Sequence, residues 1–297
     1  MENKKKSGIG SKFLILLAGI LWGCMGLFVR PLNAMKLSSW DIVFLRAVFT
    51  TLFLAILLLT KDKNLFKIKL RDLWCFLGTG LLSIVFFNLC YFKAITITTL
   101  SVAAILLYTA PAFVMIISAI CFKEKITVQK LIALVLSFTG LIFVTGVFSS
   151  TQRLTLPTFL IGLGAGLGYA LYSIFGRFAI DRGYESYTIS FYTFLFAAFT
   201  TVFFVKPINI ASTVTASPSS ILLVLLFVLV STVIPYITYT LGLKSVENGQ
   251  ASIIASIEPV VAGLNGILWF GEKLSARVII GIVLVLAGII ISNLKRR

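Results

Sequence analysis

The chain alternates between long apolar runs and short charged segments, and no polar stretch is long enough to form a soluble domain. Each run can cross a bilayer as a helix of about 20 residues and is roughly twice as long as a barrel strand. The runs lack the two-residue alternation of a barrel, and backbone groups in hydrocarbon must bond within a helix or a closed barrel. The pattern therefore predicts ten transmembrane helices, at approximately residues 12–30, 40–60, 72–92, 99–121, 128–147, 157–178, 186–206, 219–242, 248–270 and 275–294.

Composition and charge agree with this pattern. Hydrophobic residues make up 59% of the chain and charged residues 12%, against about 25% charged in a soluble domain. The net charge of +16 is unevenly distributed: with the N-terminus inside, 18 basic residues fall on the cytoplasmic side and 7 on the outer side. We expect a multi-pass protein of the cytoplasmic membrane with both termini cytoplasmic. Anionic lipid accounts for the basicity, so the bilayer is the expected partner and nucleic acid is not.

The two halves of the chain repeat each other. At an offset of 148, residues 91–126 align without a gap on residues 239–274. At an offset of 147, residues 18–30 align on residues 165–177. The repeat gives each half five of the ten expected helices.

This repeat predicts the fold class: an all-α polytopic membrane protein with ten transmembrane helices in two inverted five-helix repeats. The first repeat takes residues 1–148 and the second takes residues 149–297. Because five is odd, the second repeat enters the membrane from the opposite side. Such inverted repeats are typical of secondary transporters, whose substrate site lies between the repeats near the midplane.

Four segments carry a resemblance to a known family: "GILWGCMGLFVR", "DIVFLRAVFTT", "APAFVMIISAICFKEKITVQKLIALVLSFTGLIFVTG" and "EPVVAGLNGILWFGEKLSARVIIGIVLVLAGIII". With these segments the chain resembles an EamA-type member of the drug/metabolite transporter superfamily over essentially its whole length. The resemblance implies a carrier of amino acids, amines or related metabolites. One departure is Lys123, where the first repeat of the family usually shows glycine.

Features shared by both repeats are expected to serve the fold. Pro111 and Pro259 are equivalent, and each is predicted to kink its helix and to act as a hinge. Pro235 is expected to interrupt the run 219–242. Glu124 and Glu272 are also equivalent and are expected to be solvated loop or cap residues.

Glu258 lacks a counterpart, because Ala110 stands at the equivalent position. Its helical neighbours Ala251, Ala255 and Ala262 belong to a small-residue stripe that should face protein or a cavity. A bare carboxylate in hydrocarbon would cost tens of kcal/mol. Protonating an ordinary glutamate at pH 7 costs about 3.7 kcal/mol, close to the roughly 2.5–3.5 kcal/mol for a charge at mid-membrane. We therefore expect Glu258 to exchange a proton for a cationic substrate; a structural hydrogen bond to a neighbouring helix is the alternative.

Arg46 is likewise unmatched, since Thr193 is its equivalent. It is a candidate for binding a substrate carboxylate or for pairing with Glu258. The alternative is that Arg46 snorkels or pairs with helix-end groups near Asp41.

Aromatic and amide side chains complete the candidate site. As a set around one carboxylate they suit an organic cation or the amino end of a zwitterion, through cation–π contact. Any one of these side chains by itself would be interpreted as part of the core or of the membrane interface. The candidates are Trp22, Asn88, Tyr91, Tyr108, Tyr169, Tyr236 and Tyr239.

The residue inventory argues against an enzyme. The chain has no histidine, no Walker A motif and no pair of aspartates within the spans. We expect no catalytic residues, metal or cofactor, and a secondary transporter of small organic solutes working by alternating access, with protons as a candidate coupling ion. The alternatives are an uncoupled facilitator or exchanger and, in another class, a lipid scramblase or a non-transporting receptor. Ten helices build a complete transport unit, so a monomer or a weak homodimer is expected.

Overall fold

The computed structural model describes residues 8–146, 155–272 and 274–294, which form helices and no strand. Ten stretches are long and apolar enough to cross a membrane, as the sequence predicted. Several are built of more than one segment. In chain order they are α1 (Ile9–Gly23) with α2 (Met25–Ala34); α3 (Ser39–Lys61); α4 (Leu73–Leu77), η3 (Gly78–Val85) and α5 (Phe86–Ile97); α6 (Leu100–Leu107) with α7 (Ala110–Phe122); α8 (Val128–Thr145); α9 (Leu156–Asp181); α10 (Ser186–Thr201) with η5 (Val202–Phe204); α12 (Pro218–Val228), η6 (Leu229–Val233) and α13 (Ile234–Leu243); α14 (Asn248–Ala255) with α15 (Glu258–Phe270); and α16 (Ala276–Asn293).

Two short helices lie between the spans, η1 (Lys63–Phe66) and α11 (Pro207–Thr215), and η2 (Leu70–Asp72) begins the third span ahead of α4. The sequence analysis placed a loop where α11 forms; Ile210 and Val214 of this helix are buried. The boundary at residue 148 and the basic residues Lys4, Lys5, Lys6, Arg153, Lys273, Lys295, Arg296 and Arg297 lie outside the described residues.

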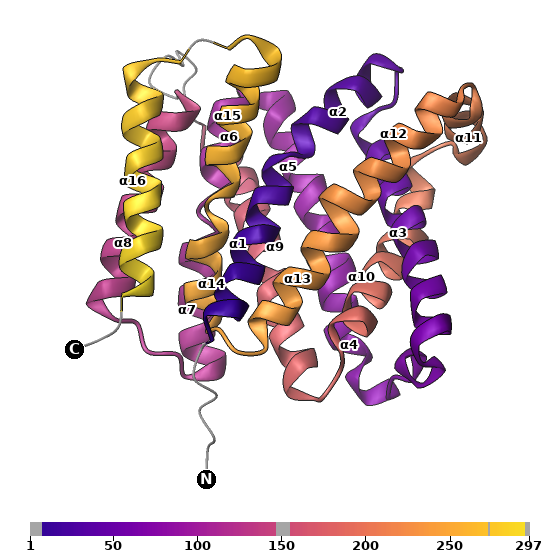
Figure 1. Cartoon of the computed structure of the whole chain (residues 1–297), viewed down its shortest axis with the longest axis horizontal. Helices are drawn as coiled ribbons and strands as arrows, with labels where there is room; N and C mark the ends of the chain where they lie inside the picture. Colours follow the sequence, from indigo (N-terminus) through magenta and orange to yellow (C-terminus); the bar gives the residue numbers. More distant parts are fainter. Residues whose placement is uncertain (1–7, 147–154, 273, 295–297) are drawn as a thin grey trace.

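Helix pairing follows a pseudo-twofold relation between the two halves. Equivalent spans contact each other directly: α8 with α16, α3 with α10, and the span α6–α7 with the span α14–α15 through α7 and α14 (Figure 1). Other contacts occur as equivalent couples, among them α1 with α13 and α9 with α5. The same holds for α1 with the broken span α14–α15 and for α9 with α6–α7. Exchanging the halves therefore reproduces most of the packing, although the contact of α7 with α14 is not matched by an equally close contact of α15 with α6.

The pair α8–α16 shows this relation at atomic detail. A Cβ added to Gly140 would lie 2.6 Å from the carbonyl oxygen of Gly281 and 2.8 Å from the backbone nitrogen of Val285. A Cβ on Gly288 would meet Ser137, the equivalent of Val285, on the other helix. Small residues let the two backbones approach closely, as is common between membrane helices.

Both repeats break their fourth span at the same place. The helix stops after Leu107 in the first repeat and after Ala255 in the second, and resumes with a proline as the second residue of α7 or α15. Proline lacks a backbone donor and suits the first turn of a helix. Pro111 and Pro259 thus begin a second half-helix.

Both repeats also contain a π-helical segment, which the sequence analysis did not predict. Gly78–Val85 (η3) and Leu229–Val233 (η6) occupy equivalent stretches of the third span of each half. Pro235 follows η6 as the second residue of α13, whereas Phe87 stands at the equivalent position after η3. Because the segment forms with and without proline, Pro235 is not its cause.

Candidate functional site

Glu258 is the first residue of α15 and lies at the break between α14 and α15. Its Oε2 accepts a hydrogen bond of 2.8 Å from the hydroxyl of Tyr169 on α9, and Tyr108 lies beside the same carboxyl group. The free N–H groups of the first turn of α15 favour negative charge at this position. The break thus gives the carboxylate a helix N-terminus in mid-span, a feature of transporter binding sites.

A cavity opens in front of this carboxylate and makes it partly accessible inside the bundle. Its walls come from α1, η3, α5, α9, α13 and both broken spans. Six of the sequence candidates line it together: Trp22, Tyr108, Tyr169, Tyr236, Tyr239 and Glu258. The lining also includes Pro111.

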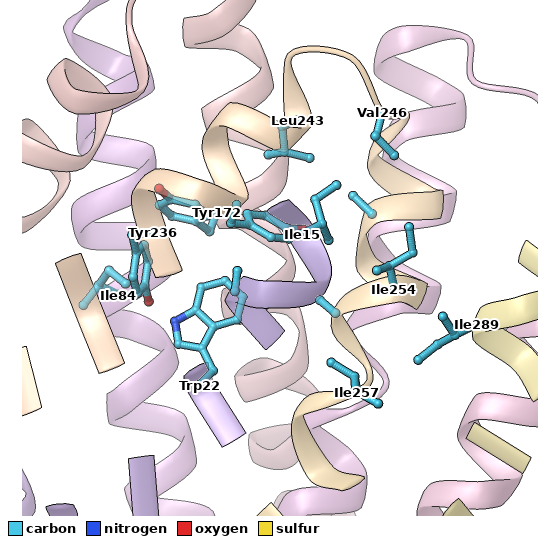
Figure 2. Packing of buried hydrophobic residues seen from close by; sticks show 14 of the residues in the cluster. Ile15, Trp22, Ile84, Tyr172, Tyr236, Leu243, Val246, Ile254, Ile257 and Ile289 are labelled. Atoms are coloured by element: carbon cyan, nitrogen blue, oxygen red, sulfur yellow. The ribbon is translucent and has the colours of Figure 1, made fainter. Parts of the chain in front are cut away.

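Aromatic rings form one wall of the cavity around Trp22. The ring centroid of Trp22 lies 5.2 Å from those of both Tyr236 and Tyr239 and 6.4 Å from that of Tyr169. Tyr172 packs edge-on against Tyr236 at 4.9 Å. Figure 2 shows the rings of Trp22, Tyr172 and Tyr236 gathered beside the aliphatic core. Such a wall offers ring faces to a cation.

Side-chain hydrogen bonds fix the rings. The hydroxyl of Tyr172 lies 2.8 Å from Oγ1 of Thr240, and that of Tyr239 lies 2.8 Å from Oγ of Ser173. These two hydroxyls bond to other side chains, whereas those of Tyr169 and Tyr108 lie at the carboxyl group of Glu258.

Three sequence candidates, Tyr91, Asn88 and Arg46, are not among the residues that line the cavity. Tyr91 stacks on Phe87 at 5.6 Å, and it is Phe87 that reaches the cavity. Asn88 is buried and donates a hydrogen bond of 2.7 Å to the carbonyl of Ile84, at the end of η3. Asn88 therefore supports the π-helical segment behind the wall.

Arg46 adjoins the cavity through Tyr236. One Nη atom lies 3.4 Å from the Tyr236 hydroxyl and the other 3.7 Å from Sδ of Met25, while Nε has no partner among the described residues. The side chain is 6% exposed, so the snorkelling interpretation is wrong. Asp41 is occupied in a capping box with Ser38. No ion pair joins Arg46 to Glu258 within the described ranges.

Several lining residues escaped the sequence analysis because serine and apolar residues are common within membrane spans. Ser83, Ser173, Ser252 and Ser256 add hydroxyl groups to the walls. Ser256 could have been found by the repeat, since it is the counterpart of Tyr108. Ile84, Phe87 and Val114 were also missed, whereas Ala110, Tyr172 and Ala255, which line the cavity too, are marked by the repeat or by the small-residue stripe.

The small-residue stripe around Glu258 is interrupted. Ala251 and Ala255 are buried, whereas Ala262 is exposed. The stripe was drawn on one continuous helix, but the break after Ala255 changes the phase of the residues that follow.

The two ends of the bundle differ, although their glutamates are equivalent. At the end where α1 begins, the Glu124 side chain is 9% exposed and accepts hydrogen bonds from the backbone nitrogens of Asn248 (2.7 Å) and Gly249 (3.1 Å) at the start of α14. At the opposite end, Glu272 is 52% exposed and pairs with Arg30 at 2.6 Å. Of the two expected roles, Glu124 therefore has that of a cap, whereas Glu272 is the solvated loop residue. Its carboxylate ties the end of α7 to the start of α14.

Replacing these twin glutamates should affect stability unequally. Glu124→Gln removes charge-assisted bonds to two buried backbone donors and should lower the free energy of unfolding by about 1–3 kcal/mol. Glu272→Gln breaks an exposed ion pair worth about 0–1 kcal/mol. Thermal unfolding of both variants in the same detergent checks this, and equal shifts would contradict the assignment of Glu124 as a buried cap.

Among the residues the structure describes, no group of three or more His, Cys, Asp or Glu side chains could hold a metal ion. The chemistry available at this site is that of one carboxylate, one guanidinium, hydroxyl groups and aromatic rings.

Comparison with known proteins places the chain among transporters. The sequence profile described as the EamA-like transporter family matches residues 10–146 and again residues 156–294. An uncharacterized transporter of Archaeoglobus fulgidus is 31% identical over 283 residues, covering 94% of each chain. An uncharacterized transporter of Bacillus subtilis, YxxF, is 25% identical, covering 100% of this chain and 93% of its own. A crystal structure of another protein has a TM-score of 0.78 at 15% identity, covering 95% of this chain and 96% of that one, and supports the fold alone.

Proposed function

Because this chain belongs to the EamA-like transporter family, we propose that it is a secondary transporter that carries small organic solutes bearing an amino group. Glu258 binds the solute and a proton in turn, so that the two fluxes are coupled. The observation that carries the proposal is the position of Glu258: a partly accessible carboxylate at a helix break in mid-span, facing an aromatic cavity. Loss of a proton from Glu258 creates the negative charge that an ammonium group needs.

In this proposal the two repeats are the structural basis of alternating access. Two halves that pack by equivalent contacts can exchange their conformations, so that the closed and the open end of the bundle change places. The tie from Glu124 to α14 and the exposed pair Arg30–Glu272 are the features that would exchange. We further propose repeats at residues 1–148 and 149–297, with both termini cytoplasmic in the cytoplasmic membrane, as the charge bias supports.

Flux into liposomes that contain only the purified protein tests the function. A thermal-shift panel of amino acids, polyamines and quaternary amines at pH 6 and pH 8 selects the solute. We expect stabilisation at pH 8 to exceed that at pH 6, because protons and the solute compete for Glu258. Radiolabelled solute should then move, and an imposed pH gradient should drive its accumulation. Solute flux that does not respond to the pH gradient would instead indicate an uncoupled facilitator or exchanger. Lipid movement without solute flux would indicate a scramblase.

Tyr169→Phe should alter this competition. The variant removes the 2.8 Å hydrogen bond to Glu258, and hydrogen bonds to charged groups contribute about 1.5–3 kcal/mol. We expect solute binding at pH 8 to weaken by about tenfold or more. Tyr172→Phe is the matched control, since its hydroxyl bonds Thr240 instead. Equal losses in the two variants would contradict a direct role of Tyr169 at the carboxylate.

A further inference from the structure

A surface hollow of about 460 Å³ lies between the start of α3 and the short helix α11, at the end of the bundle away from the start of α1 (Figure 1). Its lining includes Lys36, in the turn between α2 and α3, and Lys206, the residue before α11. Neither ammonium group has a hydrogen-bond or ion-pair partner in the described part of the chain. Asp41 also lines the hollow, but its Oδ2 is bonded to the backbone nitrogen and the hydroxyl of Ser38. Two ammonium groups against one carboxylate give the hollow a net positive charge.

The orientation of the chain in the membrane does not account for these two lysines. With the N-terminus inside, this end holds 7 basic residues and the other end holds 18. Membrane insertion places basic residues at the cytoplasmic end and leaves the outer end poor in them. Lys36 and Lys206 stand 170 positions apart in the chain and nevertheless line one hollow. Their convergence therefore indicates a common anionic partner.

The local backbone does not require a lysine at position 36 either. Lys36 has a φ of 65°, in the left-handed region that favours glycine. The equivalent turn of the second repeat does contain glycine, Gly183, with a φ of 86°. Glycine would thus form the same turn with less strain, so that what the lysine adds is its side chain.

The equivalent place in the second repeat is filled by the protein itself. Tyr184, which follows Gly183, donates a hydrogen bond of 2.9 Å to Asp72 and accepts one of 3.0 Å from the backbone nitrogen of Lys69. Thr188, the equivalent of Asp41, donates one of 2.7 Å to the carbonyl of Leu65. The segment that follows α3 thus covers the start of α10. The segment that follows α10 leaves the hollow open at the start of α3.

Apolar surface continues from the hollow along α10. Phe203 lines the hollow and is 76% exposed, and its ring packs edge-on against that of Phe199, which is 69% exposed and one turn further into the span. Phe204, also in the lining, stacks on Trp40 at 4.8 Å. Aromatic residues are common where a span meets the headgroup region. A ligand with a charged head and an apolar tail fits this arrangement.

We propose that the hollow binds the headgroup of an anionic phospholipid, with its phosphate between Lys36 and Lys206 and an acyl chain along Phe203 and Phe199. The side-chain amide of Asn209 on α11 is placed to bond a hydroxyl of the headgroup. Basic pockets between membrane helices are known to bind anionic headgroups. The bound lipid joins α11 to the start of α3. This site is separate from the cavity at Glu258 and does not depend on the proposed transport activity.

The test measures lipid binding to the full chain in detergent, by native mass spectrometry and by thermal unfolding. The probes are phosphatidylglycerol, phosphatidylcholine with the same acyl chains, and glycerol 3-phosphate. Wild type should bind phosphatidylglycerol about fivefold to tenfold more tightly than phosphatidylcholine, and it should unfold at a higher temperature with the former. Lys36→Gly and Lys206→Gln should each weaken the binding of phosphatidylglycerol about fivefold. Glycerol 3-phosphate has the charge but no acyl chain and should not stabilise the protein at the same concentration.

The controls separate a specific site from general attraction between charges. Lys36→Gly installs the residue of the other repeat at a positive φ, so stability without lipid should be kept or raised. Arg277→Gln removes one charge at the start of α16, on the other side of the bundle from α11 (Figure 1), and should bind phosphatidylglycerol as wild type does.

Two kinds of result would overturn the proposal. Equal binding of the two phospholipids by wild type, or an equal loss in Arg277→Gln and in the two lysine variants, would show that the hollow is not a headgroup site. Stabilisation by glycerol 3-phosphate as large as that by phosphatidylglycerol, and lost in the lysine variants, would replace the lipid by a soluble anion. Neither result bears on solute flux through the cavity at Glu258, so the two proposals fail independently.

Discussion

Glu258→Gln should abolish the response of solute flux to a pH gradient. Glutamine keeps the shape of the side chain and can still accept a hydrogen bond from Tyr169, but it neither takes up nor releases a proton. A solute that needs a negative partner also loses it, so binding at pH 8 should weaken by at least about tenfold. The measurement is uptake into liposomes with and without an imposed gradient, together with binding at pH 6 and pH 8.

The repeat provides the control for this variant. Ala110 occupies the position equivalent to Glu258 and is buried at the start of α7. Glu258→Ala therefore installs a residue that the same helix break already accommodates, and the thermal stability without solute should be kept. If Glu258→Gln carries solute with an unchanged gradient response, the carboxylate is a structural hydrogen-bond acceptor and the coupling mechanism is wrong.

The fold was largely predictable because two of its features, the membrane spans and the repeat, are visible directly in the sequence. Ten apolar runs of sufficient length give ten spans, since hydrocarbon leaves the backbone few alternatives. The internal repeat gives the pairing, because equivalent helices must make equivalent contacts. Pro111 and Pro259 also mark their breaks directly, through the donor that proline lacks.

The irregular segments within the spans were not predictable, because they depend on contacts between different helices. The π-helical segments occur in both halves, but their sequences share no breaker: Pro235 follows one and Phe87 follows the other. The break after Gly23 in the first span likewise has no proline beside it. In both cases packing against neighbouring helices overrides local preference.

The sequence predicts those site residues whose side chains are rare within membrane spans, and it misses those whose side chains are common there. A lone carboxylate in an apolar run is costly enough to attract attention, and Glu258 does face a cavity. A serine or a phenylalanine in a span carries no such signal, which is why Ser252 and Phe87 were missed. Tyr91 and Asn88 show the converse: both are polar and near the right depth, yet the helix turns them behind the wall.

Two equivalent glycines, Gly19 and Gly166, let the first span of each repeat pack closely against a broken fourth span, and adding a side chain at either should have a large effect. A Cβ on Gly19 of α1 would lie 2.6 Å from Cγ2 of Ile257 and 2.9 Å from the carbonyl oxygen of Ala255, at the break beside Glu258. A Cβ on Gly166 of α9 would lie 2.8 Å from the carbonyl oxygen of Leu106, at the equivalent break.

Gly19→Ala and Gly166→Ala should therefore each lower the free energy of unfolding by about 1–3 kcal/mol, because a backbone carbonyl cannot yield as a flexible side chain does. They should also slow solute flux, since each displaces a half-helix that lines the cavity. Gly26→Ala and Gly176→Ala are matched controls, as a Cβ at either meets nothing within 4 Å. Alanine raises helix propensity, so these controls should be neutral or slightly stabilising. Thermal unfolding and flux of the four variants separate the two pairs; equal losses in all four would show that the breaks do not depend on close approach at Gly19 and Gly166.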